Sequence, residues 1–147
     1  MPDFSGFTVP GRFQKMKDNV IIDVAHNPPA IKALVETISL TENRKVNFIY
    51  GSMRDKDIGS VIRYLGDIAE KIFVVSVDEE NRGAKVTDIV EKADEYIKPL
   101  LFSADNDRET MKRALEDSTR NNIPLVVTGS FYTVEKFLRW QNEKNGI

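Results

Sequence analysis

The sequence predicts an α/β domain, a Rossmann-like, mostly parallel sheet flanked by helices. Short apolar and β-branched runs alternate with amphipathic helical segments along nearly the whole chain. The length of 147 residues fits one domain with an ordinary buried core. Hydrophobic residues make up 41% of the chain and charged residues 30%, a balance that is typical of a globular protein. We therefore expect residues 1–147 to form a single domain.

The alternation starts after an opening segment, 1–18, which its prolines and glycines predict to be irregular. Five strands are expected from short apolar runs at 19–24, 45–50, 71–77, 99–102 and 124–128. A helix is expected after each strand, at 28–40, 57–69, 86–97, 107–120 and 131–142. Strands joined through helices require right-handed crossovers, so most of the sheet should be parallel.

Each helix is predicted from apolar side chains that recur every three or four residues and so share one face. In chain order these are Ile31, Leu34, Val35 and Ile38; Ile58, Val61, Ile62, Leu65 and Ile68; Ile89, Val90 and Ala93; Met111, Ala114 and Leu115; and Val134, Phe137 and Leu138. We expect these faces to pack against the sheet. The longest polar connection after the opening segment, 78–85, is the best candidate for a mobile element.

Composition excludes several functional classes. The formal net charge is −2 and no Lys/Arg-rich block occurs, whereas a nucleic-acid-binding surface needs a basic stripe, so no nucleic-acid partner is expected. The chain has no cysteine and one histidine, His26, which excludes thiolate and multi-histidine metal sites. It shows neither a signal peptide nor the roughly 18-residue apolar run of a membrane span, so we expect a cytoplasmic protein without a membrane partner.

Polar residues follow four of the predicted strands. In an open α/β sheet, ligands bind beyond the carboxyl ends of the strands, so these residues are candidates for a site. They are Asp23, His26 and Asn27; Gly51, Ser52, Arg54, Asp55, Lys56 and Asp57; Asp78, Asn81 and Arg82; and Gly129 and Ser130. Carboxylates, cations, an imidazole and hydroxyls would gather at one edge, which predicts a site for a charged, polar ligand.

Each of these residues also has a structural interpretation. Asn27 precedes a proline and is a typical helix N-cap; Asp55 or Asp57 could cap the second helix, and Ser130 the last. His26 could be an ordinary packed or surface histidine, although its place before a helix N-terminus favours contact with an anion. Two phosphate-binding motifs, G-x-x-x-x-G-K-[ST] and G-x-G-x-x-G, are absent from the sequence.

Five short motifs, taken in chain order, resemble one family of enzymes. They are Pro10-Gly11-Arg12-Phe13-Gln14, Asp23-Val24-Ala25-His26-Asn27-Pro28, Gly51-Ser52-Met53-Arg54-Asp55-Lys56-Asp57, Arg82-Gly83-Ala84 and Thr128-Gly129-Ser130-Phe131-Tyr132. Together they cover nearly the whole chain and resemble elements of the C-terminal, glutamate-ligase domain of folylpolyglutamate synthase/dihydrofolate synthase. Mur ligases of cell-wall synthesis share the fold and a similar D-x-A-H-x-P motif, and are the alternative within this class. The D-K-D and G-S-F-Y elements favour the folate branch.

The resemblance implies one part of an ATP-dependent ligase. Such enzymes transfer the γ-phosphate of ATP to a carboxylate of folate or dihydropteroate, and the amine of L-glutamate then attacks the acyl phosphate to give an amide. A covalently linked N-terminal ATPase domain, absent from this sequence, carries the P-loop and most of the Mg²⁺ ligands. The chain alone is therefore expected to be inactive. A non-catalytic ligand-binding module of the same fold is the remaining alternative.

The resemblance also implies roles for individual residues. Arg12 and Asp23 are expected to contact ATP on its nucleoside side, where Asp23 can accept hydrogen bonds from ribose hydroxyls. His26 and Ser130 are expected near glutamate. His26 is the candidate catalytic residue, because an imidazole can hold a carboxylate or receive an amine proton. The further candidates for substrate binding at this edge are Asn27, Asp55 and Lys56.

Overall fold

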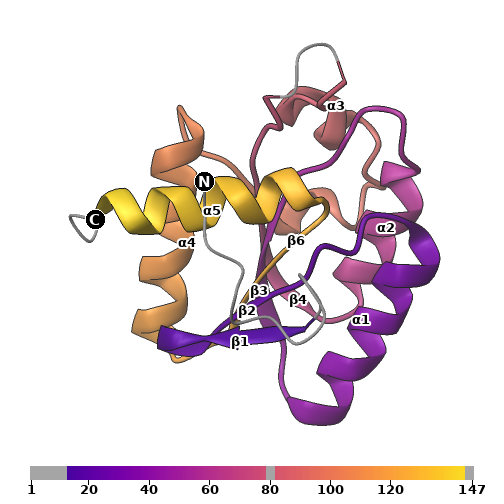
Figure 1. Ribbon diagram of the computed structural model, residues 1–147. Helices are drawn as coiled ribbons and strands as arrows, with labels where there is room; N and C mark the ends of the chain where they lie inside the picture. Colours follow the sequence, from indigo (N-terminus) through magenta and orange to yellow (C-terminus); the bar gives the residue numbers. More distant parts are fainter. Residues whose placement is uncertain (1–12, 79–81, 145–147) are drawn as a thin grey trace.

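The computed structural model describes residues 13–78 and 82–144 (Figure 1). The strands are β1 (Gln14–Met16), β2 (Val20–Ile22), β3 (Val46–Tyr50), β4 (Ala69–Val74), β5 (Leu101–Phe102) and β6 (Leu125–Thr128). The α-helices are α1 (Pro28–Thr41), α2 (Ile58–Gly66), α3 (Val86–Glu91), α4 (Asp107–Asn121) and α5 (Phe131–Lys144). Two 3-10 turns, η1 (Lys17–Asn19) and η2 (Lys98–Leu100), complete the described elements.

The six strands form one sheet in the order β1-β2-β6-β3-β4-β5. Every neighbouring pair is parallel except β1 and β2, which confirms the predicted fold class. Strand β6 comes last in the chain but lies between β2 and β3. It is followed by α5 on one face of the sheet, whereas β2 and β3 are followed by α1 and α2 on the other (Figure 1). The carboxyl end of β6 is therefore a switch point of the kind that forms ligand sites in such sheets.

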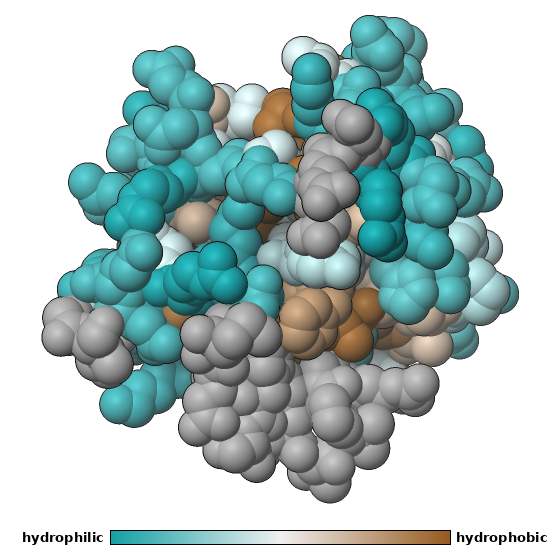
Figure 2. Space-filling model, turned by 45° about the horizontal axis from the view of Figure 1, so that its top comes forward, coloured by the Kyte–Doolittle hydropathy of each residue, from teal (hydrophilic) through white to brown (hydrophobic). Residues whose placement is uncertain are grey.

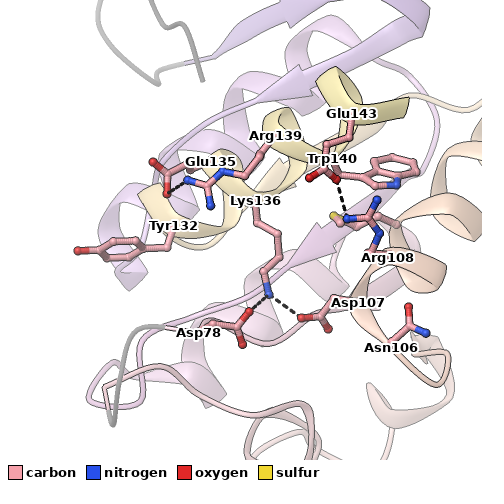
Figure 3. Close-up of a pocket in the computed structure, with 11 residues that line it drawn as sticks. Asp78, Asn106, Asp107, Arg108, Tyr132, Glu135, Lys136, Arg139, Trp140 and Glu143 are labelled. Atoms are coloured by element: carbon pink, nitrogen blue, oxygen red, sulfur yellow. Dashed lines mark hydrogen bonds and ion pairs between the residues drawn. The ribbon is translucent and has the colours of Figure 1, made fainter. Parts of the chain in front are cut away.

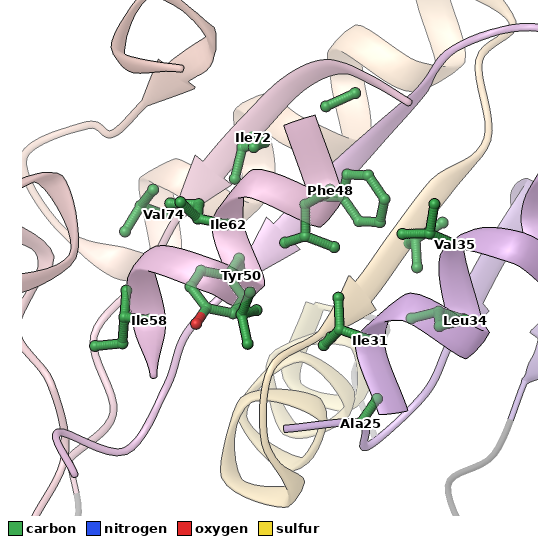
Figure 4. Close-up of a cluster of buried hydrophobic side chains, with 14 of the residues drawn as sticks. Ala25, Ile31, Leu34, Val35, Phe48, Tyr50, Ile58, Ile62, Ile72 and Val74 are labelled. Atoms are coloured by element: carbon green, nitrogen blue, oxygen red, sulfur yellow. The ribbon is translucent and has the colours of Figure 1, made fainter. Parts of the chain in front are cut away.

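Two cores lie on opposite faces of the sheet. Successive residues of a strand point to opposite faces, and β3 sends Phe48 and Tyr50 into the core beneath α1 and α2 (Figure 4). Ile49 points into the second core, where Phe137 and Trp140 of α5 pack. The apolar faces predicted for the helices are buried, apart from the half-buried Val90 and Leu138. The second helix was predicted to reach residue 69 but ends at Gly66, so Ile68 lies between α2 and β4, where it is half-buried.

A buried polar network joins α4 to the sheet. Asn47 on β3 is fully buried, and its amide donates to Oδ2 of Asp117 at 2.8 Å and to Oγ of Ser118 at 3.0 Å. Lys71 on β4 donates to Oδ1 of the same carboxylate at 2.9 Å. Burial raises the pKa of Asp117, but hydrogen bonds from Lys71 and Asn47 outweigh it, so the pKa lies below its usual value.

The opening segment differs from the prediction. Residues 14–16 are not irregular, because they pair antiparallel with β2. The reversal is made by Asp18 and Asn19, whose φ angles of 61° and 62° are left-handed. Asp and Asn tolerate that conformation better than other non-glycine residues. The remainder of the opening segment, up to residue 12, lies outside the described residues.

The third predicted helix is also shorter than expected, ending at Glu91 and not at residue 97. The amides of Lys92 and Ala93 bond to carbonyls three residues back, which closes the helix as a tight turn. Ile97 is nonetheless buried, and its Cδ1 lies where a side chain on Gly66 of α2 would stand. Of the three side chains that the apolar spacing predicted to be buried here, Ile89 and Ala93 are buried and Val90 is half-buried, but the helix is shorter than predicted.

Candidate functional site

The carboxyl ends of β2, β3 and β6 meet at the switch point, and the candidate residues gather there. Beside it, a groove of about 600 Å³ runs along the first turns of α1. Its lining comprises Phe13, Asp23, Val24, Ala25, His26, Asn27, Pro29, Ala30, Ala33, Leu34 and Thr37. The groove combines an apolar wall with one carboxylate and one imidazole. Figure 2 shows the molecule with the top of Figure 1 turned forward. This face is largely hydrophilic, with apolar side chains near its centre.

Asp23 lies directly after β2 and is 9% exposed. Its Oδ1 accepts the N–H of Ala25 at 2.8 Å, and its Oδ2 accepts the N–H of Phe13 at 2.9 Å. The carboxylate therefore shapes the turn and fixes the start of β1 against it. The carboxylate of Asp23 also lines the groove, where its oxygens can act only as acceptors.

His26 and Asn27 form the entry to α1. Asn27 caps the helix, since its Oδ1 accepts the N–H of Ala30 at 2.9 Å, and this confirms the capping interpretation. Helix N-termini usually hold anions through free N–H groups. Here Pro28 and Pro29 have none and that of Ala30 is taken, so the first turn offers an anion the helix dipole rather than backbone donors.

His26 is exposed above this turn. Its Nδ1 lies 3.2 Å from the carbonyl oxygen of Val24. When Nδ1 carries the proton and donates to that carbonyl, Nε2 is left as an acceptor at the mouth of the groove. An imidazole held in this way can receive a proton from an amine or, when charged, hold a carboxylate.

The loop after β3 carries the D-K-D segment. Asp57 caps α2 by accepting the N–H of Ser60 at 3.2 Å, and hydrogen bonds from Ser60 hold the pKa of Asp57 below its usual value. Asp55 is exposed and Lys56 half-buried. The structure therefore assigns the cap to Asp57 and leaves Asp55 and Lys56 at the edge of the site.

The loop after β4 is joined to this segment. Gly83 pairs with Met53, and the N–H of Ala84 donates to the carbonyl of Ser52 at 2.9 Å. A side chain on Gly83 would lie 1.9 Å from the carbonyl oxygen of Val77, so only glycine fits there. Arg82 is exposed beside this bridge. Asn81 and part of the loop predicted to be mobile lie outside the described residues.

Ser130 caps α5, as its structural interpretation predicted. Its Oγ accepts the N–H of Thr133 at 3.0 Å and lies 2.8 Å from Oγ1 of Thr133. The preceding Gly129 has a φ of 116° and donates its N–H to the carbonyl of Ala25 at 3.1 Å. Ser130 is 3% exposed, so little of its side chain is accessible from outside.

Tyr50 supports the switch point from below. Its ring lies against Gly129, where an added Cβ would stand 2.7 Å from ring carbon Cδ1. Burial raises the pKa of Tyr50 to about 12, although a hydrogen bond with Ser52 opposes the shift. The phenol is therefore neutral at any physiological pH and acts as structural support rather than as a base.

A second groove, of about 360 Å³, lies between α4 and α5 (Figure 3). Lys136 points from α5 to Asp107 Oδ2 at 2.6 Å, to Asp78 Oδ2 at 2.9 Å and to the carbonyl of Ser76 at 2.7 Å. Its three N–H donors are thus used internally. The hydrogen bond from Lys136 is the main reason that the pKa of Asp78 lies below its usual value. This cluster fixes the start of the loop after β4.

Thr133 and Lys136 were not among the candidate residues predicted from the sequence. Thr133 was detectable, because it lies three residues after a helix-capping serine, the spacing of a capping box. Lys136 had no such signal, since its partners come from two other elements. Arg12, expected at the nucleotide, lies outside the described residues.

Two absences hold for the described parts of the chain. Within residues 13–78 and 82–144, no three His, Cys, Asp or Glu side chains form a group that could hold a metal ion. In the same ranges, no helix is long and apolar enough to cross a lipid bilayer. The cytoplasmic location inferred from the sequence stays a prediction.

This fold and site agree with a family match. Residues 11–131 match the family described as Mur ligase, glutamate ligase domain, and the chain belongs to that family. Within it, the chain is 31% identical over 129 residues to the dihydrofolate synthase/folylpolyglutamate synthase of Escherichia coli (strain K12), covering 86% of this chain. It is 30% identical over 122 residues to the protein of the same description from Haemophilus influenzae, covering 80% of this chain. The family resemblance of the five motifs is thereby confirmed.

The chain spans less than a third of these relatives: 29% of the E. coli protein and 28% of the H. influenzae protein. Solved structures agree with this comparison. The chain superposes on E. coli FolC in complex with ADP with a TM-score of 0.80 at 25% identity, covering 95% of this chain and 33% of that one. A bifunctional folylpolyglutamate synthase/dihydrofolate synthase with Mn, AMPPNP and L-glutamate bound gives a TM-score of 0.76 at 25% identity, covering 95% and 32%.

Proposed function

We propose that this chain is the glutamate-ligase domain of an ATP-dependent enzyme that adds L-glutamate to folate or dihydropteroate. The observation that carries the proposal is the placement of Asp23 and His26. Both lie at the carboxyl end of β2 and line one groove, yet the first is buried in its floor and the second is exposed at its mouth. The short segment between β2 and α1 can therefore contact two different substrates.

The groove suits the nucleoside part of ATP. Phe13, Pro29 and Leu34 supply an apolar wall for a base, and Asp23 supplies acceptors for the ribose hydroxyls. Arg12, next to Phe13 in the chain, is proposed to contact the same nucleotide through its fork of donors. The relatives solved with ADP or AMPPNP support a nucleotide in this family.

His26 is proposed to act on glutamate, with Ser130 and Asn27 nearby and Asp55 and Lys56 at the same edge. In the reaction, a carboxylate oxygen of the folate attacks the γ-phosphorus of ATP and ADP leaves. The glutamate amine then attacks the acyl carbon, phosphate leaves, and the nitrogen loses a proton. The exposed His26 can hold the glutamate carboxylate or receive that proton. The contribution of this domain is to orient the two substrates.

The remaining machinery is proposed to lie on a covalently linked N-terminal ATPase domain. The sequence has no P-loop, and the described residues contain no cluster suited to Mg²⁺. The relatives carry more than two thirds of their length outside the matched region. Phosphate binding and Mg²⁺ are therefore assigned to that domain, and closure of the two domains would complete the site.

A second function in the same class has one observation in its favour. The chain is 28% identical over 126 residues to the UDP-N-acetylmuramoyl-L-alanyl-D-glutamate--2,6-diaminopimelate ligase of Alkaliphilus metalliredigens, covering 80% of this chain and 26% of that protein. A peptidoglycan-precursor ligase is thus the alternative, and a non-catalytic binding module of the same fold is the third.

The test is substrate-dependent release of phosphate from ATP and Mg²⁺ by the full-length enzyme that carries this domain. We expect turnover with a folate or dihydropteroate and L-glutamate, and none with UDP-muramoyl substrates. The isolated chain should match the no-enzyme control, because it cannot hold the phosphates of ATP. Turnover only with the UDP-muramoyl substrates would favour the Mur alternative, and turnover with neither would favour the binding module.

A further inference from the structure

We propose that Thr133 is a positioning residue of this site, which orients the Ser130 hydroxyl and joins it to the loop after β3. The inference rests on the proposed function. Thr133 lies in the first turn of α5 and is 1% exposed, so it does not itself contact a substrate. Thr133 would act on the substrate indirectly, through its hydrogen bonds to the Ser130 hydroxyl and the Gly51 carbonyl.

Thr133 makes three hydrogen bonds at the switch point. Its N–H donates to Ser130 Oγ at 3.0 Å, its Oγ1 donates to the carbonyl of Gly51 at 2.9 Å, and the two hydroxyl oxygens lie 2.8 Å apart. A threonine hydroxyl has one proton. Because that proton goes to Gly51, the hydroxyl of Ser130 must be the donor in the bond between the two side chains.

This assignment fixes what Ser130 can offer to a ligand. Its proton is directed at Thr133 Oγ1 and one lone pair receives the Thr133 N–H. The remaining capacity is a single lone pair, which accepts but does not donate. The group of glutamate that contacts Ser130 must therefore be a hydrogen-bond donor. When both carboxylates of glutamate are ionised, its α-amino group is its only donor. Thr133 thus selects the amine end of the substrate.

Helix capping alone does not explain this geometry. In a capping box, the third residue turns its side chain back to the N–H of the N-cap. Thr133 turns instead to Gly51, the residue directly after β3. The approach is close: a Cβ on Gly51 would lie 2.8 Å from Thr133 Oγ1, and a Cβ on Gly129 would lie 2.0 Å from Gly51 O. Gly51 therefore leaves room for the threonine hydroxyl, and Gly129 leaves room for the Gly51 carbonyl that accepts the hydrogen bond.

The same bond links Ser130 to the D-K-D loop. Gly51 is the first residue of the chain that runs from β3 to Lys56 and Asp57. Removing the Thr133 hydroxyl would leave the Gly51 carbonyl without this donor and would free the Ser130 hydroxyl to rotate. Both changes act at the proposed glutamate end of the site and leave the two backbone hydrogen bonds of Asp23 in place.

The experiment compares Thr133→Val, Thr133→Ser and Ser130→Ala in the full-length ligase, with ATP and glutamate varied separately. Thr133→Val keeps the shape and loses the hydroxyl, whereas Thr133→Ser keeps the hydroxyl. For Thr133→Val we expect about a tenfold rise in the KM for glutamate and less than about a twofold change for ATP, the size of one lost hydrogen bond. Thr133→Ser should restore the KM to within about threefold of the wild type.

A double variant separates positioning from packing. If Thr133 acts through Ser130, adding Thr133→Val to Ser130→Ala should cause no further loss in the use of glutamate. Unchanged glutamate kinetics in Thr133→Val, beside an impaired Ser130→Ala, would overturn the inference and leave the proposed function standing. Equal losses for both substrates without rescue by serine would also overturn it. A wild-type enzyme that shows no ligation at all would remove the proposed function, and this role with it.

Discussion

Gly129 offers a direct test of the geometry at the switch point. Replacing it by alanine should destabilise the domain by about 2–4 kcal/mol. A side chain at its φ of 116° is strained, which costs on the order of 1–2 kcal/mol. The new Cβ would lie 2.0 Å from the carbonyl oxygen of Gly51, and relieving such overpacking costs roughly 1–3 kcal/mol. The lower entropy of the unfolded alanine chain offsets up to about 1 kcal/mol.

The assay is unfolding of the purified chain by heat and by urea, followed by circular dichroism. A loss of this size should lower the Tm by about 5–15 °C in a domain of this length. The matched control is Gly59→Ala in α2, where the nearest atom to a new Cβ is the carbonyl oxygen of Lys92 at 3.4 Å. That variant should be neutral or up to about 1 kcal/mol more stable. A Tm for Gly129→Ala within about 2 °C of the wild type would refute the reasoning.

Three further predictions concern the described structure. Asp117→Ala should cost about 1–3 kcal/mol in urea at pH 7, since Asn47 and Lys71 lose their acceptor. Because the pKa of Asp117 is lowered in the folded state, its contribution is present above its unfolded pKa of about 4 and disappears as the pH falls through the folded value, so wild type and variant should converge in acid. Lys136→Met should cost more than Asp78→Asn, for which we expect less than about 1 kcal/mol, because Asp78 is 76% exposed. The chain should also unfold in a single cooperative transition, as expected of one domain, and two separate transitions would contradict that.

The strand and helix positions followed from periodicity, because burial on one face repeats at the period of each element. β1 escaped this reasoning, since Gln14–Met16 is a short polar edge strand that exists only through its pairing with β2. Its detectable signal was the turn, where Asp18 and Asn19 adopt left-handed angles. The length of α3 escaped it as well, because the helix end depends on the packing of Ile97 at Gly66.

The sequence predicted which side chains gather at this edge of the sheet, but not which hydrogen bonds each of them makes. The rule of strand carboxyl ends gathered Asp23, His26 and Ser130 at one edge, as the structure has them. Whether a residue caps, binds or does both depends on where its lone pairs point. Asp23 accepts hydrogen bonds from two backbone N–H groups and also lines a groove. In contrast, the hydroxyl of Ser130 makes two hydrogen bonds with Thr133.

Asp23 and His26 are proposed to hold different substrates. In the full-length enzyme, Asp23→Ala should mainly weaken the use of ATP, and His26→Ala should mainly weaken the use of glutamate. Each loss should be roughly tenfold to a hundredfold in kcat/KM, the size of about one hydrogen bond to a charged group. Asp67→Ala is the control, because Asp67 is an exposed carboxylate at the far end of α2.

The deciding measurement is steady-state kinetics with ATP and glutamate varied separately, together with the Tm of each variant. Asp23→Ala is expected to lower the Tm as well, because two backbone N–H groups lose their acceptor. His26→Ala should leave the Tm nearly unchanged, since the side chain is exposed. Opposite substrate preferences in the two variants are the predicted result. Equal losses for ATP and glutamate in both variants, with a destabilised fold, would show that this turn is structural and not a binding site.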